Sequence, residues 1–291
     1  MSGDVEITAK LDSADLVQAW AKKKGLKPKV CVRTRIAART DLGLIRENNE
    51  DKFEFFEPEE LELLSAKGCF YAVADGMGGH ASGQIASELA LKTILRTYYA
   101  DPSEDVAQSI TSAIQAANSY IYEVGQSVPE RSGMGTTCTV AVIWEGELIV
   151  AQVGDSRAYL IRGGGIRQIT RDHSWVEEQV QRGALTREEA EVSPFRNVIT
   201  RSLGAGPDVE VDIFREPIRK DDIVLLCSDG LSGYVSDSEI LEIVRASSPA
   251  LAAMKLVDRA NERGGGDNIT VLIVAIKDVE KASRGRRLFT R

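Results

Sequence analysis

Between residues 136 and 170 the chain repeats one pattern, a short segment of alternating apolar and polar side chains followed by a tight turn. An alternation with a period of two is typical of β-strands rather than helices. Parallel strands need a crossover of about a dozen residues, whereas a tight turn joins antiparallel neighbours. The pattern therefore predicts antiparallel strands at 136–143, 147–153, 157–162 and 166–170, with turns at Glu145-Gly146, Gly154-Asp155 and Gly163-Gly164-Gly165.

Longer segments on both sides of this run carry apolar residues at the spacing of an α-helix. These segments occur in consecutive pairs, at 82–99 and 102–125 and near 236–246 and 249–262. Continuous apolar runs predict further strands at 69–74, 222–228 and 269–277. Paired helices beside groups of strands favour a layered α+β fold over an alternating βαβ fold. We expect a four-layer αββα sandwich, in which two antiparallel β-sheets are flanked by helices.

The main domain is expected to span residues 32–278, between an N-terminal extension (1–31) and a basic C-terminal tail (279–291). In the extension, Asp12 or Ser13 is placed to cap a short helix that ends at Gly25. For the tail we prefer a frayed end to a basic docking peptide. Within the domain, residues 172–200 are polar and mixed, which predicts a helical surface insertion.

Composition restricts the class of partner and the compartment. The formal net charge of −8 argues against nucleic acid as the main partner, although a phosphorylated substrate stays compatible with it. Residues 1–10 do not resemble a signal peptide and no run of 18 apolar residues occurs, so we expect a cytoplasmic protein without a membrane span. The four cysteines are widely spaced, which favours buried reduced thiols over a zinc site.

Acidic residues border the predicted strands, and several of them are followed or preceded by glycine. They are Glu50 and Asp51, Asp75, Asp155, Asp229 and Asp267. A single Asp-Gly pair usually marks a turn. A carboxylate at the end of a buried strand is costly unless it is paired or binds a metal, and hard cations prefer oxygen ligands. With five such segments and only two histidines, the chain points to Mg²⁺ or Mn²⁺ rather than zinc.

These segments, in this order, resemble the metal-dependent protein phosphatase family, of the protein phosphatase 2C type, in its bacterial form. The resemblance covers residues 32–276, nearly the whole chain outside its two ends. The motifs that carry it are Thr40-Asp41-Leu42-Gly43 through Asn49-Glu50-Asp51, Ala74-Asp75-Gly76-Met77-Gly78-Gly79-His80, Gly133-Met134-Gly135-Thr136-Thr137, Val153-Gly154-Asp155-Ser156-Arg157, Cys227-Ser228-Asp229-Gly230-Leu231 and Gly265-Gly266-Asp267-Asn268-Ile269-Thr270-Val271.

The resemblance implies a site for two Mn²⁺ or Mg²⁺ ions at one end of a β-sandwich. Asp75 would bridge both ions and Arg46 would bind the substrate phosphate through its planar guanidinium. For one ion the other ligands implied are Asp229 and Asp267. For the second they are Glu50 and the carbonyl of Gly76, with Asp51 close by. Asp155 would help to hold a third, weaker ion.

The implied activity is hydrolysis of phosphoserine or phosphothreonine in proteins by a hydroxide that bridges the two metals, without a covalent enzyme intermediate. Its substrates would be phosphoproteins, the products of a Ser/Thr kinase, and the expected oligomeric state is a monomer. The alternative is a catalytically silent pseudophosphatase that acts as a scaffold or sensor, but the full metal set favours the enzyme. A further alternative is an unrelated metallohydrolase acting on small phosphate esters.

Two positions depart from the family pattern and leave the general acid unassigned. Some relatives carry histidine where this chain has Met77, and bacterial relatives often carry His-Pro where it has Ser193-Pro194. His80, His173 and a metal-bound water are the candidates that stay open. The insertion 172–200 matches the mobile flap that relatives carry beside the site, where it is expected to set substrate choice. A variable surface loop is the alternative.

Overall fold

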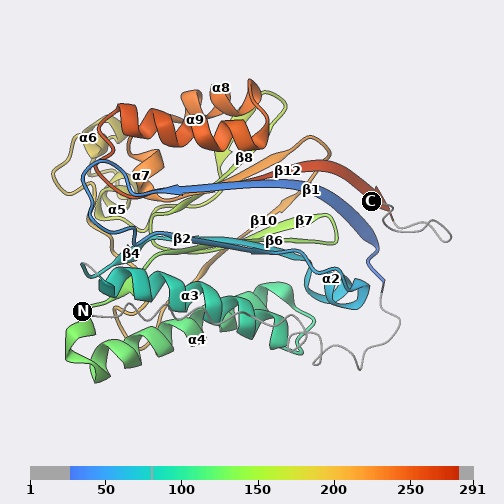
Figure 1. Cartoon of the computed structure of the whole chain (residues 1–291), viewed down its shortest axis with the longest axis horizontal. Coiled ribbons are helices and arrows are strands. Elements are labelled where there is room, and N and C mark those ends of the chain that lie inside the picture. The colour runs from blue at the N-terminus through green and yellow to red at the C-terminus, as the bar shows by residue number, and fades with distance from the viewer. Residues whose placement is uncertain (1–26, 80, 282–291) are drawn as a thin grey trace, which may run out of the picture.

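Two antiparallel β-sheets lie face to face, and helices cover the outer face of each in the computed structural model (Figure 1). The structure describes residues 27–79 and 81–281. The short helix predicted before Gly25, His80, and the tail after Lys281 lie outside the described residues. The four-layer α+β sandwich expected from the sequence is confirmed.

The first sheet has five strands, all paired antiparallel. In spatial order they are β1 (Val30–Asp41), β12 (Ile269–Lys281), β11 (Ile223–Cys227), β8 (Arg157–Arg162) and β9 (Gly165–Gln168). β1 and β12 pair along their whole length, from Val30 opposite Lys281 to Asp41 opposite Ile269. Both strands run beyond the expected domain edges at residues 32 and 278, so the first three residues of the predicted tail belong to β12.

The second sheet also has five antiparallel strands. They are, in spatial order, β10 (Asp212–Pro217), β7 (Glu147–Val153), β6 (Cys138–Trp144), β3 (Cys69–Ala74) and β2 (Lys52–Phe56). The predicted strand 136–143 is interrupted at Thr137. Its first residue, Thr136, belongs to β5 (Gly135–Thr136), which pairs with β4 (Gly76–Met77) outside both sheets.

One predicted turn is not a hairpin. β6 and β7 form a hairpin in the second sheet, and β8 and β9 form one in the first. The segment from Gly154 to Ser156 therefore crosses from one sheet to the other instead of pairing β7 with β8. The expectation of neighbouring strands on both sides of Gly154 is wrong, because a turn of this length serves a sheet-to-sheet crossing as well as a hairpin.

The helices fall on the two outer faces (Figure 1). α3 (Ala81–Ala100) and α4 (Val106–Ser127) cover the second sheet, and α8 (Asp237–Arg245) and α9 (Pro249–Glu262) cover the first. Shorter helices are α2 (Leu61–Lys67), the 3₁₀ turn η1 (Pro129–Arg131), α5 (Trp175–Gln181), α6 (Arg187–Glu191) and α7 (Asp229–Ser232). None of the helices in the described ranges is long and apolar enough to cross a bilayer.

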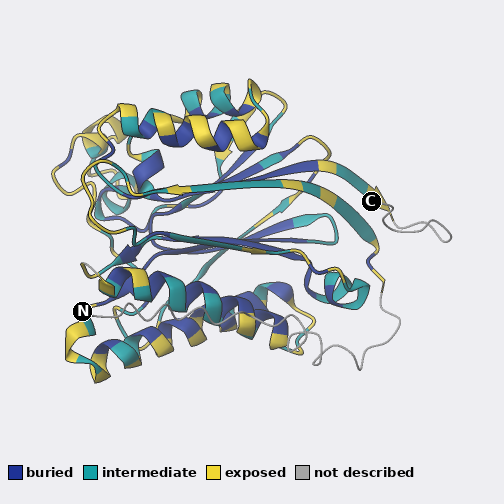
Figure 2. Cartoon of the chain, in the orientation of Figure 1, coloured by how far each residue is buried: buried dark blue, intermediate teal, exposed yellow. Residues whose placement is uncertain are grey.

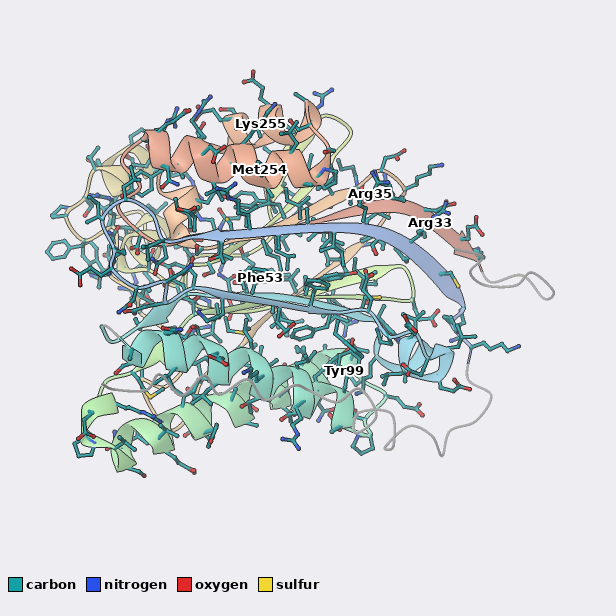
Figure 3. All side chains as sticks on the ribbon, in the orientation of Figure 1. Arg33, Arg35, Phe53, Tyr99, Met254 and Lys255 are labelled. Atoms are coloured by element: carbon teal, nitrogen blue, oxygen red, sulfur yellow. The ribbon has the colours of Figure 1, made fainter. Side chains whose placement is uncertain are left out.

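Three buried apolar layers hold these elements together (Figure 2). One lies between α3, α4 and the second sheet, one between the two sheets, and one between the first sheet and α8, α9. Figure 3 shows Phe53 between the sheets and Tyr99 between sheet and helix, whereas Met254 and Lys255 lie on the outer side of α9. Each large apolar side chain that these layers bury contributes about 1.5–3 kcal/mol to folding.

Candidate metal centre

The acidic segments predicted from the sequence meet at one end of the sandwich. In the second sheet the last residue of β3, Ala74, lies opposite Lys52, so Asp75 and Asp51 emerge at the same edge. In the first sheet Cys227 lies opposite both Arg157 and Val271, which brings the starts of β8 and β12 to the end of β11. Asp51 and Asp75 directly adjoin these strand ends, and Asp155, Asp229 and Asp267 each lie two residues from one.

The carboxylates are close enough to raise one another's pKa. Removal of water around Asp75 raises its pKa well above the ordinary value, and repulsion from Asp51, Asp229, Asp155 and Asp267 raises it further. Burial is also the first cause that raises the pKa of Asp51 to about 7 and that of Asp155 to about 8. Such clustering of negative charge is unfavourable unless a cation compensates for it.

Three of these side chains carry a buried oxygen without a hydrogen-bond partner among the described residues: Oδ1 of Asp51, Asp155 and Asp229. Nearly all buried polar atoms in proteins have a partner, so three orphans in one cluster require an explanation. A hard divalent cation, which takes oxygen ligands, fits this donor set. Asp75, Asp229, Asp267 and Asp51 are the residues that would hold two such ions, with Asp155 at a third position.

The side chains do not form a ready-made cage. No group of three or more His, Cys, Asp or Glu residues within 27–79 and 81–281 is arranged to hold an ion. Ser228 Oγ donates to Oδ2 of Asp51 at 2.6 Å, and Arg46 Nη2 lies 2.8 Å from Oδ2 of Asp267. Cation binding therefore requires rotation of carboxylates that now contact protein groups, whereas the strands and turns that carry them are in place.

Two threonines hold the backbone at Asp75. Thr137 Oγ1 accepts the N–H of Asp75 at 2.9 Å, and the carbonyl of Asp75 accepts from Thr137 N at 2.8 Å and from Thr136 Oγ1 at 2.9 Å. Both donor and acceptor of this residue are thereby satisfied at the interruption between β5 and β6. Both threonines belong to the motif Gly133-Met134-Gly135-Thr136-Thr137, but the sequence alone indicates no role for their side chains.

Three backbone segments approach closely beside Glu50. Gly76 N donates to the carbonyl of Glu50 at 3.2 Å. A Cβ on Gly76 would lie 2.1 Å from the carbonyl oxygen of Gly83, and a Cβ on Gly83 would lie 1.9 Å from Oε2 of Glu50. Glycine is thus required at both positions for the first turn of α3 to reach Glu50 and the Gly76 carbonyl. Gly83 is a residue that the sequence analysis did not single out.

Asn268 organises the loop that carries Arg46. Its Oδ1 accepts from Glu50 N at 2.8 Å, and its Nδ2 donates to the carbonyls of Leu42 and Asn48 at 2.9 and 3.0 Å. One buried side chain therefore ties three points of residues 42–50 to the start of β12. The side chain of Arg46 stays 52% exposed at the rim of the acidic cluster, which leaves it accessible to a ligand.

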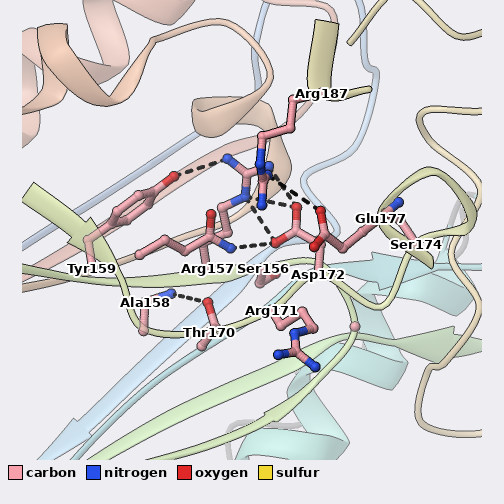
Figure 4. Close-up of polar contacts among 12 residues, drawn as sticks. Ser156, Arg157, Ala158, Tyr159, Thr170, Arg171, Asp172, Ser174, Glu177 and Arg187 are labelled. Atoms are coloured by element: carbon pink, nitrogen blue, oxygen red, sulfur yellow. Dashed lines mark hydrogen bonds and ion pairs between the residues drawn. The ribbon is translucent and has the colours of Figure 1, made fainter. Parts of the chain in front are cut away.

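The insertion 172–200 contains α5 and α6, which agrees with the helical surface segment expected from the sequence. We refer to it as the flap. At its base Arg157 donates to both carboxylate oxygens of Asp172, with the shortest contact 2.6 Å, and Arg157 Nη1 donates to Tyr159 Oη at 3.1 Å (Figure 4). Trp175 and Phe195 pack together within the flap, with ring centroids 5.1 Å apart.

The structure narrows the choice of general acid. His173 is buried, its Nδ1 accepts from Gly154 N at 3.0 Å, and its Nε2 lies 3.3 Å from Oδ2 of Asp212. Both ring nitrogens thus face protein groups, so His173 is not placed to donate a proton to a leaving group. His80, the other candidate side chain, lies outside the described residues.

The chain resembles known proteins over most of its length. Residues 41–179 match the family model described as protein phosphatase 2C. The chain is 38% identical over 252 residues to the serine/threonine protein phosphatase PstP of Mycobacterium tuberculosis. The aligned region covers 87% of this chain but only 47% of that relative. It is 39% identical over 248 residues to the protein phosphatase PhpP of Streptococcus pneumoniae, covering 84% of this chain and 98% of the relative.

A solved structure shows the same fold. The catalytic domain of PstP, a serine/threonine protein phosphatase crystallised in complex with two manganese ions, superposes with a TM-score of 0.74 at 37% identity. The match covers 85% of this chain and all of that one. This chain spans about half the length of the full mycobacterial relative and nearly all of the streptococcal one.

Proposed function

The chain belongs to the protein phosphatase 2C family, and from this premise we propose that it is a metal-dependent phosphatase that removes phosphate from serine and threonine side chains of proteins. The observation that carries the proposal is the convergence of five aspartates at one end of the sandwich, three of which have a buried oxygen without a partner within residues 27–79 and 81–281. An acidic cluster of this kind requires cations, and two divalent ions beside an exposed arginine suit a phosphate ester.

We assign the metal ligands as follows. Asp75, whose backbone is held by hydrogen bonds with Thr136 and Thr137, would be the ligand shared by both ions. The other ligands are Asp229 and Asp267 for one ion, Glu50, Asp51 and the carbonyl of Gly76 for the second, and Asp155 for a third, weaker ion. When bound, Mn²⁺ or Mg²⁺ would supply a nucleophile by lowering the pKa of a shared water.

The substrate phosphate is assigned to Arg46. Its guanidinium lies 2.8 Å from Asp267 and is half-exposed, so it is next to the proposed ligands and open to solvent. A planar fork of N–H donors matches two phosphate oxygens at once, which orients the ester for attack. The loop contacts made by Asn268 keep Arg46 in register with the acidic cluster.

The state of the cysteines and the net charge bear on the biological setting of the protein. The four cysteines are free thiols, three of them buried, which suits the reducing cytoplasm. A net charge of −8 fits phosphoprotein partners better than nucleic acid. We propose that the chain acts in signalling, as a monomer, on the products of a Ser/Thr kinase, through a domain of residues 32–278 whose flap, 172–200, borders the site.

Two other functions are less well supported. A pseudophosphatase scaffold would not need the complete set of acidic residues that the structure gathers. A hydrolase of small phosphate esters would share the site but show little preference for phosphopeptides. The relatives that match over nearly their whole length are named as protein phosphatases, which favours a protein substrate.

The experiment that tests the proposal is hydrolysis of a phosphothreonine peptide by the purified chain with Mn²⁺, with EDTA, and by the variants Asp229→Ala and Asp208→Ala. Asp208 is an exposed aspartate outside the cluster and serves as the matched control. We expect Mn²⁺-dependent release of phosphate that EDTA and Asp229→Ala abolish and Asp208→Ala preserves. No release by the wild-type chain, with Mn²⁺ binding confirmed by calorimetry, would favour the scaffold function instead.

A further inference from the structure

Two consecutive residues at the entry of the flap hold both sides of the turn that carries Asp155. On one side Asp172 pairs with Arg157, two residues after Asp155, through three contacts of 2.6–3.1 Å (Figure 4). On the other side His173 is hydrogen-bonded twice to Gly154, the residue before Asp155. The sheet-to-sheet crossing is therefore clamped by the flap and not only by its flanking strands.

The contacts of His173 define its tautomer. The backbone N–H of His173 donates to the carbonyl of Gly154 at 3.0 Å, and the N–H of Gly154 donates to Nδ1 at 3.0 Å. Because Nδ1 accepts, the proton of the neutral ring resides on Nε2, which lies 3.3 Å from Oδ2 of Asp212 and 3.2 Å from Nη1 of Arg201. Burial, and then the nearby Arg201 guanidinium, lower the pKa of His173.

The same residue also closes the base of the flap. The carbonyl of His173 accepts from Thr200 N at 2.8 Å, and the next residue, Ser174, forms a β-bridge with Ile199. Trp175 N then donates to the carbonyl of Val198 at 2.8 Å. Entry and exit of the flap are thus paired, and His173 connects that pair to Gly154.

Gly154 in turn has little freedom to move away from the site. Its φ is +105°, and a Cβ at this position would lie 2.6 Å from the side chain of Thr137. Thr137 Oγ1 accepts the backbone N–H of Asp75. The flap base is therefore bonded through His173 to Gly154, whose backbone leaves no room for a Cβ beside Thr137, the residue that accepts from the proposed bridging aspartate.

We propose that His173 is a positioning residue that fixes the flap base and the Asp155 turn as one unit, so that cation binding at Asp155 and ordering of the flap are coupled. The inference rests on the proposed function only in taking Asp155 as a cation ligand. Binding free energies that are coupled act in both directions, so a cation at Asp155 orders the flap and an ordered flap raises the affinity for that cation.

Two substitutions separate the two ends of the imidazole. Asn places an acceptor oxygen where Nδ1 lies and loses the contact with Asp212, whereas Gln places a donor near Nε2 and loses the acceptor for Gly154 N. We expect His173→Gln to weaken the Asp155-dependent step of a Mn²⁺ titration by about tenfold, the usual effect of removing a residue that orients a ligand. It should also speed amide hydrogen exchange across 175–198.

His173→Asn is expected to retain most of both properties, and Asp212→Asn, which alters only the Nε2 side, is the matched control. If His173→Gln folds and leaves both the Mn²⁺ titration and the exchange of residues 175–198 at wild-type values, the proposal is wrong. Equal damage from the Asn and Gln variants would likewise contradict a role that depends on the Gly154 bond.

A second measurement needs no change at His173. Amide exchange of the flap is compared with and without Mn²⁺ in the wild-type chain and in Asp155→Asn. Coupling requires that Mn²⁺ slows exchange in the wild type and has a much smaller effect in the variant, whereas equal slowing in both overturns it. Exchange is measured without substrate, so a chain that failed to hydrolyse phosphopeptides would refute the proposed function and leave this result unaffected.

Discussion

At the scale of single residues, the acidic cluster suits a cation but lowers the stability of the folded chain when no cation is bound. Asp51 is only 1% exposed, and one of its oxygens has no partner in the described chain. An uncompensated carboxylate in that position destabilises the folded state. The same arrangement that favours a divalent cation is therefore a source of instability when the cation is removed.

Replacing Asp51 by Asn tests whether its charge destabilises the cation-free fold. Asn keeps the size of the side chain and the acceptor for Ser228 but removes the charge. In EDTA the variant should melt a few degrees above the wild type, since about 1 kcal/mol corresponds to roughly 2–4 °C in a domain of this size. The increase in melting temperature on adding Mn²⁺ should be smaller than in wild type. Asp237→Asn, an exposed acid in the first turn of α8, should instead lower stability slightly. A lower melting temperature of Asp51→Asn in EDTA would contradict the repulsion.

Gly83 gives a second prediction at this scale. A methyl group at Gly83 would meet Oε2 of Glu50 at 1.9 Å, so Gly83→Ala must displace that carboxylate from its place beside Gly76. We expect at least about tenfold weaker Mn²⁺ binding, measured by calorimetry. Gly125→Ala in α4 is the matched control, because its Cβ has no neighbour closer than 3.4 Å and Ala favours a helix over Gly by about 1 kcal/mol. Wild-type Mn²⁺ affinity in Gly83→Ala would remove Glu50 from the ligand set.

At the scale of elements, the sequence predicted the interior of the fold better than its edges. The bounds of β7 and β8 match the prediction, because most side chains of both strands are buried. Three strands of the two sheets, β1, β2 and β10, were not predicted. All three are edge strands with charged residues, and β10 ends in a proline, so none of them carries the apolar signal of a central strand.

The candidate site shows the same division. Its acidic residues were identified from their place at strand ends and from the family resemblance. The supporting residues Gly83, Asn268 and His173 act through contacts with segments distant in sequence, which no local pattern encodes. The crossing at Gly154 was missed for a related reason, because the choice between hairpin and crossover depends on which sheet β8 joins.

The corner between α8 and α9 provides a prediction about pH. Glu239 accepts from Ser236 Oγ at 2.8 Å and from Arg263 Nη1 at 2.8 Å, and these contacts lower its pKa from 4.5 to about 2. A carboxyl whose pKa is lowered on folding stabilises the fold at pH values above its unfolded pKa and loses that effect as the pH falls toward its folded pKa. The contribution of Glu239 is therefore complete above about pH 5 and declines between pH 4.5 and 2.

Urea unfolding of wild type and Glu239→Gln at a series of pH values measures this contribution. The difference in unfolding free energy should be constant from pH 7 to about pH 5 and shrink below that range. Glu242→Gln, an exposed change on the same helix, is the matched control variant. A difference between wild type and Glu239→Gln that stays constant down to pH 3 would show that the carboxylate charge is not what links the two helices.

At the scale of the whole molecule, the proposed ligands come from both sheets. Asp51 and Asp75 border strands of the second sheet, Asp229 and Asp267 border strands of the first, and Asp155 lies in the crossing between them. The set exists only when the two sheets face each other across their shared apolar layer. An ion held by these proposed ligands would therefore connect the two halves of the sandwich and would have no equivalent site in the unfolded chain.

Mn²⁺ should consequently raise the melting temperature of the chain in a concentration-dependent manner. A ligand that binds only the folded state stabilises it by about 2.7 kcal/mol at one hundred times its dissociation constant. Asp229→Ala should remove most of this shift, and potassium chloride at equal ionic strength serves as the control for screening. A melting temperature that does not respond to Mn²⁺, in a chain that binds it by calorimetry, would mean that the ion does not connect the sheets.

The pairing of β1 with β12 has a consequence for engineering. Val30 and Lys281 are direct antiparallel partners, so their Cα atoms lie about 5 Å apart at the pole opposite the acidic cluster. A reporter attached at either residue starts its path far from the substrate entrance, and two reporters attached at both start as immediate neighbours. In a chain shortened to residues 30–281, a short peptide bridge between these two positions would close the backbone into a ring, and new termini could then be opened in the β8–β9 hairpin without cutting any segment that carries a proposed ligand.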